Sequence, residues 1–202
     1  MFDLFLILTK GGPVMIPLLL CSVISLAVTI ERICFWWRIR SKELARQMLG
    51  LVEQGEVNKA LSVGEGSSLP VARVLAAGLA HRNPSPSKAM EAAAQAEVSI
   101  LKRQLTILDT IITLAPLLGL LGTITGMISS FGIMSKAGIG QPHAVTGGVA
   151  EALIATATGL LIAIVTLIPY NYFTSRVERE IEEIEHYASR LELLLHSKEG
   201  AT

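Results

Sequence analysis

The sequence predicts an all-α integral membrane protein with three transmembrane helices, two of them extended into a long cytoplasmic helical bundle. The 202-residue chain is 51% hydrophobic with a mean hydropathy of +0.54, too apolar for a soluble domain of this size. Uncharged runs at residues 11–30, 110–135 and 152–175 each reach the roughly 20 residues that cross a bilayer. The sequence between and after these runs has helical periodicity.

The basic residues predict the orientation of the three spans. Of the 17 Lys and Arg residues, all but Lys10 and Lys136 lie at residues 32–103 or after residue 172. Because cytoplasmic segments carry an excess of Lys and Arg, we expect a periplasmic N-terminus and a cytoplasmic C-terminus. The start of the chain lacks a basic region and a small-residue cleavage site, so the first apolar run is expected to be retained.

A short outer segment, residues 1–12, precedes the first transmembrane helix at residues 13–37. The turn formed by Gly11, Gly12 and Pro13 starts this helix, and Pro17 falls in its first turns, where a missing N–H matters least. The aromatic run at residues 35–37 is typical of a belt at the membrane interface, which would hold the inner end of the span.

Residues 38–108 are predicted to be a cytoplasmic region of short helices. Breaks are expected at Gly55, at residues 64–70 and at residues 83–86, where Ser85 followed by Pro86 is a helix start signal. After this start, six residues keep heptad spacing into the second span without a helix breaker: Met90, Ala94, Glu97, Leu101, Gln104 and Leu108. We therefore expect one uninterrupted helix from Ser85 through that span.

The second span, residues 109–135, carries the first candidate for an ion path. On an ideal helix, Thr123 shares a face with four other residues, Pro116, Gly119, Gly126 and Ser130. Small residues at this spacing allow close helix packing, whereas hydroxyls at mid-depth favour a hydrated seam, and both interpretations stay open. Asp109 is a possible inner mouth of the path, although a carboxylate at this level is more often simply solvated.

A periplasmic loop at residues 136–149 is followed by the third span, residues 150–173. Glu151 opens this span, where the helix dipole would favour a carboxylate for structural reasons alone. An ionisable residue at a membrane edge is also a functional candidate, and we prefer this functional interpretation. Thr156 shares a face with Gly159, Ala163 and Thr166, and lies about 140° from Glu151 on an ideal helix. Residues 174–202 form an amphipathic helix with a coiled-coil-like seam.

Other classes of function find little support in the sequence. Cys21 and Cys34 are thirteen residues apart on one helix, too far for a disulfide, and no metal site or cofactor is expected. No phosphate-binding glycine loop and no nucleophile with a base is present, so we expect neither an enzyme nor a nucleic-acid-binding protein. A secondary transporter would show more spans or an inverted repeat.

The two segments that surround the threonines resemble one known family. APLLGLLGTITGMISSF and GGVAEALIATATGLLIAIVTLIPYNYF are similar to the ExbB/TolQ/MotA family of proton-channel stator subunits, and most similar to ExbB. In that family the positions of Thr123, Thr156 and Glu151 line or border the ion path. Independently of the resemblance, Gly119, Gly126 and Gly159 are expected to pack helices, because small residues allow close approach.

The resemblance implies a homopentamer in the bacterial inner membrane that encloses an ExbD-like single-span protein. Proton-motive force would then drive movement that energises a TonB-like transducer and outer-membrane transport. A TolQ-like subunit of a Tol-Pal motor is one alternative, and an oligomeric scaffold whose small residues only pack helices is another. This chain has no acidic residue in the central part of a span, so the essential central carboxylate is expected on the partner.

Overall fold

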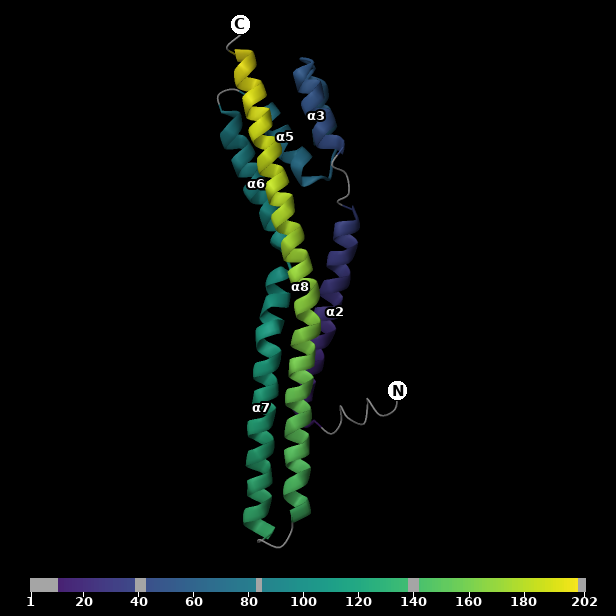
Figure 1. The fold of residues 1–202 in the computed structure, drawn as a ribbon, viewed down its shortest axis with the longest axis vertical. Coiled ribbons are helices and arrows are strands. Elements are labelled where there is room, and N and C mark those ends of the chain that lie inside the picture. Colours follow the sequence, from purple (N-terminus) through teal and green to yellow (C-terminus); the bar gives the residue numbers. More distant parts are fainter. Residues whose placement is uncertain (1–10, 39–42, 83–84, 138–141, 200–202) are drawn as a thin grey trace. The chain divides into compact units, whose positions relative to one another are not determined.

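The computed structural model describes residues 11–38, 43–82, 85–137 and 142–199, and the regular structure in these ranges is helical (Figure 1). The chain divides into two compact units. The first, called here the spanning unit, combines the chain up to Glu31 with Gln104–Tyr172. The second, called the bundle unit, combines Arg32–Arg103 with the chain from Phe173 onward.

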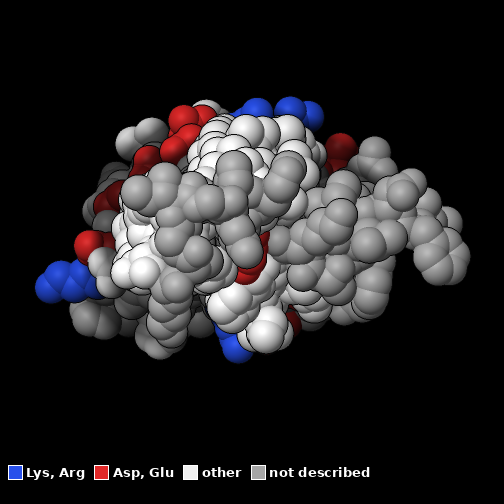
Figure 2. All heavy atoms as spheres, turned by 90° about the horizontal axis from the view of Figure 1, so that it is seen from below, with Lys and Arg blue, Asp and Glu red and all other residues white. Residues whose placement is uncertain are grey.

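Three helices in the described residues are long and apolar enough to cross a membrane. They are α2 (Met15–Arg38), α7 (Leu105–Ala137) and α8 (Pro142–Glu199), which contain the three uncharged runs of the sequence. Large apolar side chains stay exposed on all three, including Ile16 and Ile128 at 66% and Ile168 at 69%. Most of the described surface in Figure 2 is likewise uncharged. Such faces suit lipid or other subunits rather than water, so the predicted all-α membrane fold is confirmed.

In the spanning unit, α7 and α8 run side by side in opposite directions (Figure 1). The N-terminal part of α2 packs against both helices. Seven buried residues from the three helices and from the turn before α2 form one apolar cluster: Val14, Met15, Leu18, Cys21, Ile111, Ala115 and Ala155. The cluster ties the three spans together, and it leaves their outer faces free for other contacts.

A buried pair of hydroxyls joins α2 to α8 in the spanning unit. Ser25 Oγ and Thr166 Oγ1 lie 2.7 Å apart, and their residues are 7% and 1% exposed. The Thr166 hydroxyl also lies 2.7 Å from the Ile162 carbonyl, one turn earlier in its own helix. The pair therefore satisfies two polar groups that would otherwise be buried without a partner, at a cost in free energy.

The bundle unit combines four short helices with the second half of α8. They are α3 (Glu43–Glu53), α4 (Val57–Glu65), α5 (Pro70–Ala80) and α6 (Pro86–Lys102). The apolar helix α5 is buried along most of its length. Gly78 lets it lie close to α6, since a Cβ there would stand 2.6 Å from Met90 Cγ. An ion pair of 3.0 Å between Arg73 and Glu97 also joins α5 to α6.

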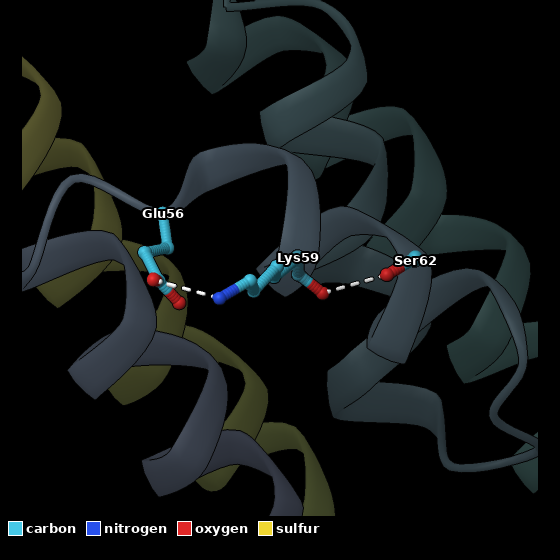
Figure 3. A network of polar contacts seen from close by, with 3 residues as sticks. All are labelled: Glu56, Lys59 and Ser62. Carbon is cyan, nitrogen blue, oxygen red and sulfur yellow. Dashed lines mark hydrogen bonds and ion pairs between the residues drawn. The ribbon is translucent and has the colours of Figure 1, made fainter.

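The predicted breaks between the short helices are confirmed. Gly55 separates α3 from α4. Its φ of 87° is a conformation that glycine adopts readily because it has no Cβ. At the start of α4 the Glu56 carboxylate pairs with Lys59 at 2.8 Å, and the Ser62 hydroxyl donates to the Lys59 carbonyl at 2.9 Å (Figure 3). Pro86 begins α6, but Ser85 makes no side-chain capping bond.

The expectation of one uninterrupted helix from Ser85 through the second span was wrong. α6 ends at Lys102, and α7 starts at Leu105. Between them Gln104 has a φ of 73°, a left-handed conformation that no α-helix accommodates. Leu101 before the break and Leu108 after it are both fully buried, each within its own unit.

The third span also differs from expectation at its start. α7 reaches Ala137 and α8 begins at Pro142, so both helices extend into the predicted loop at residues 136–149. Residues 138–141 of that loop, and residues 1–10 of the expected outer segment, lie outside the described residues. α8 then continues past Pro169 to Glu199 without interruption. The predicted seam of its tail is confirmed in part by buried Val177, Ile184 and Leu191.

Aromatic and basic side chains meet in the bundle unit where α2 ends. Arg32 is 3% exposed, lies 4.5 Å over the Phe35 ring and donates to the Leu101 carbonyl at 3.4 Å. Trp36 is 6% exposed beneath Arg176, whereas Trp37 is 82% exposed. The Trp37 ring is thus exposed and the Phe35 ring half-buried, whereas Trp36 belongs to the protein interior.

Candidate functional site

The contact between α7 and α8 is built on glycine. A Cβ at Gly159 would collide with the Ala115 carbonyl oxygen, and one at Gly119 would lie 3.0 Å from Thr156 Cα. A Cβ at Gly126 would lie 2.8 Å from Ala152 Cβ. The two backbones therefore approach more closely than side chains allow, which is how small residues join helices in membranes.

Thr156 faces this contact. Its hydroxyl donates a 2.8 Å hydrogen bond to the Gly119 carbonyl of α7. Gly119 can make this contact because it has no side chain, and Thr156 is half-buried against it. The Thr156 hydroxyl oxygen can still accept a hydrogen bond through its lone pairs. The arrangement fits both packing and a polar lining.

Thr123 lies one turn beyond Gly119 on α7. Its hydroxyl donates to the Leu120 carbonyl at 2.6 Å, which is a bond within its own helix. The side chain is half-exposed in the single chain, beside the exposed apolar residues Leu120 and Ile124. The structure therefore places the two threonines on neighbouring turns of the α7–α8 pair, with Thr156 turned into the pair and Thr123 at its edge.

Glu151 does not stand at the start of its helix, as the sequence suggested. α8 begins nine residues earlier at Pro142, so the dipole of its own helix does not explain why a carboxylate lies at position 151. Its carboxylate lies instead against Gly12, in the turn before α2. Thr156 faces α7 and Glu151 faces the start of α2, so one chain does not bring the two side chains together.

Asp109 is exposed in the first turns of α7. The exposed Thr113 follows it one turn later, and the Thr113 hydroxyl lies 2.9 Å from the Thr110 carbonyl and 3.3 Å from that of Asp109. At 1.5 Å per residue, Asp109 and Thr123 are about 21 Å apart along the axis of α7. Both residues thus lie on faces of α7 that remain open in a single chain.

Sequence reasoning missed three residues of this region. Gly122 lies at the closest approach of α7 to Ala155, because a Cβ there would stand 2.5 Å from Ala155 Cβ. Its position three residues after Gly119 and four before Gly126 was the available signal. The contacts of Gly12 and Ser25 were also missed. Their partners, Glu151 and Thr166, lie more than a hundred positions away in the sequence.

The spans hold few acidic residues. Those within the described parts of the three span segments predicted from the sequence are Glu31, Asp109 and Glu151, each near a span end. No group of three or more His, Cys, Asp or Glu side chains suited to a metal ion occurs among the described residues. The candidate site therefore offers hydroxyls and close backbone packing at mid-depth, with carboxylates toward the ends.

Comparison with known proteins gives a consistent result. A family model described as the MotA/TolQ/ExbB proton channel family matches residues 67–186. An ExbB-like biopolymer transport protein of Synechocystis, "ExbB-like 3", is 39% identical over 191 residues, covering 91% of each chain. The Aquifex aeolicus biopolymer transport protein ExbB is 39% identical over 92 residues, which cover 46% of this chain and 62% of its own. The Tol-Pal system protein TolQ of Pseudomonas aeruginosa is 37% identical over 112 residues, covering 55% of this chain and 48% of its own.

Proposed function

The chain belongs to the MotA/TolQ/ExbB proton channel family, and on that premise we propose that it is the ExbB-type subunit of an inner-membrane motor. The motor converts proton-motive force into mechanical work for TonB-dependent outer-membrane transport. The observation that carries this proposal is the glycine-lined contact of α7 and α8, with Thr156 bonded across it to Gly119 and Thr123 on the next turn. The family model covers all of α7 and the part of α8 up to residue 186, which includes this contact.

In the proposed assembly, five copies of the chain form a ring around the transmembrane helix of an ExbD-like protein. The open faces of α7 that carry Asp109 and Thr123 support a ring lumen on that side. The N-terminus would be periplasmic and the C-terminus cytoplasmic, as the Lys and Arg distribution predicts.

The proton-carrying carboxylate of the motor is proposed to belong to the partner. Hydroxyls relay protons but do not store charge, and about 30 Å of hydrocarbon separates the two membrane edges. The span carboxylates of this chain lie near the span ends, so a central titratable group must come from elsewhere. Glu151 would tune proton entry, and Thr123 and Thr156 would line the path beside the partner's carboxylate.

Proton flux into liposomes tests the proposal. The purified chain is reconstituted alone, and together with an ExbD-like single-span protein that carries an intramembrane Asp. A pH gradient and a potential are then imposed, and internal pH is followed with a dye. We expect little flux from the chain alone, flux with the partner, and loss of that flux in Thr123→Val. Rapid flux from the chain alone that depends on Thr123 would overturn the partner's role.

A TolQ-type role is the second candidate, because the similarity to the Pseudomonas aeruginosa Tol-Pal protein covers more than half of this chain. Complementation separates the two roles. An ExbB-type subunit restores TonB-dependent uptake in a strain lacking its own ExbB and TolQ. Restoration of outer-membrane integrity in that strain, without uptake, would favour the Tol-Pal role.

A further inference from the structure

Gly12 is in direct contact with Glu151. A Cβ at Gly12 would overlap Glu151 Oε1 and stand 3.1 Å from Glu151 Cδ. The neighbouring Gly11 rests on the same turn of α8, since its Cβ would lie 3.3 Å from Ile154 Cγ2. The turn before α2 is therefore seated on the stretch of α8 that carries the carboxylate.

Two separate features require glycine at this position. Its φ of 74° is a conformation that side chains other than glycine rarely adopt. The space that a side chain would fill is already occupied by the Glu151 carboxylate. A glycine needed only for the turn would not have to face an acidic group, so the contact itself calls for an explanation.

The contact places the carboxylate at the amino end of α2. The Met15 N–H donates to the Gly12 carbonyl at 3.1 Å, so the helix begins directly beyond Gly12. The amino end of a helix attracts negative charge. Glu151 thus extends from the side of one span to the beginning of another, and Gly12 sets how closely the two can approach.

We propose that Gly12 is a positioning residue, whose lack of a side chain leaves the space in which the Glu151 carboxylate lies at the amino end of α2. The inference rests on the proposed function, in which Glu151 borders the ion path. A side chain at position 12 displaces the carboxylate from this place. A displacement of about 1 Å can lower the rate of a reaction about 100-fold, so the position of the Glu151 carboxylate matters for the rate of proton entry.

Gly12→Ala tests the proposal against two control variants. Gly147→Ala adds a methyl group on α8 at a position with no atom within 4 Å of the new Cβ. Gly55→Ala carries the same strain of positive φ, at 87°, but lies in the bundle unit. We expect Gly12→Ala to lower partner-dependent proton flux by about tenfold or more, and both controls to keep it. Equal loss in Gly55→Ala would show that strain alone is responsible.

A rescue variant separates positioning from general damage. Glu151→Asp withdraws the carboxylate by one methylene, which leaves room for the methyl group of Gly12→Ala. Each single variant should lose flux, and the double variant should recover flux beyond either one. If the double variant loses as much proton flux as the two single variants lose together, the inference is contradicted.

A chemical readout keeps this test independent of transport. The rate at which dicyclohexylcarbodiimide labels Glu151, measured by mass spectrometry of the assembled protein, should rise several-fold in Gly12→Ala and stay unchanged in Gly147→Ala. An unchanged rate in Gly12→Ala would overturn the positioning role. If labelling changes but Glu151→Gln keeps full flux, the positioning role stands and the functional role proposed for Glu151 fails.

Discussion

The Thr156 hydroxyl donates a 2.8 Å hydrogen bond to the Gly119 carbonyl, across the glycine-lined contact between α7 and α8. The bond joins one of the two threonines of the predicted ion path to a glycine expected from the sequence to pack helices. Packing and lining are therefore not exclusive alternatives at this position, because the same side chain can do both. Substitutions can separate the two roles.

Thr156→Val should weaken the α7–α8 contact and abolish energy coupling. Valine keeps the volume of threonine but loses the hydroxyl, and interhelical hydrogen bonds in membranes are worth about 0.6 to 1.7 kcal/mol. Thr156→Ser should keep most activity. Thr158→Val is the matched control, since the Thr158 hydroxyl bonds only within α8, to the Ile154 carbonyl. Uptake assays and oligomer melting in detergent measure the two effects, and full uptake by Thr156→Val would favour a packing role alone.

Ser25 and Thr166 should show energetic coupling between α2 and α8. In a double-mutant cycle of Ser25→Ala and Thr166→Val, followed by unfolding in detergent, we expect a coupling of about 0.6 kcal/mol and at most about 2 kcal/mol. The control cycle pairs Ser25→Ala with Thr125→Val, whose hydroxyl bonds to carbonyls of its own helix. Additive effects for Ser25 and Thr166 would show that their buried contact contributes nothing.

Gly159→Ala should destabilise the spanning unit, because the new methyl group meets the Ala115 carbonyl oxygen and backbone cannot move aside cheaply. Overpacking of this kind costs about 1 to 3 kcal/mol. Gly132→Ala, with no atom within 4 Å of its new Cβ, is the control and should be neutral or stabilising. The temperature at which the oligomer dissociates measures the stability of both variants. Equal dissociation temperatures for Gly159→Ala and Gly132→Ala would contradict the packing role of Gly159.

Gln104 should tolerate glycine better than valine. At its φ of 73° an L-residue costs about 1 to 2 kcal/mol, which glycine avoids. Gln104→Gly should therefore be neutral or stabilising in thermal unfolding, whereas the β-branched Gln104→Val should destabilise. If the helix were continuous instead, the glycine variant would be the less stable of the two.

The orientation of the spans can be tested by labelling. In a background of Cys21→Ala and Cys34→Ser, single cysteines are introduced by Gln141→Cys and by Ser68→Cys. A membrane-impermeant maleimide applied to the periplasmic side should label position 141 and leave position 68 unlabelled. Ser68 is exposed between α4 and α5, so shielding inside the fold does not explain a lack of labelling there. Equal labelling of both positions would reject the three-span topology.

By itself the sequence determined the class of protein, the number of apolar helices long enough to span a membrane and the break between α3 and α4. Apolar runs identify spans because their length must match the hydrocarbon thickness, and glycine or proline marks a break through its own backbone preferences. Both are local properties, readable from adjacent residues. The heptad seams are local as well, and buried Leu101, Ile184 and Leu191 lie where the spacing predicted them.

The tertiary structure alone decided how the helices turn toward one another. The heptad spacing runs through Gln104 unchanged, so nothing in the periodicity reveals the break there. That Thr156 meets Gly119, Thr166 meets Ser25 and Glu151 meets Gly12 depends on the rotation and separation of whole helices. These quantities follow from the packing of segments far apart in the chain, so no window of sequence contains them.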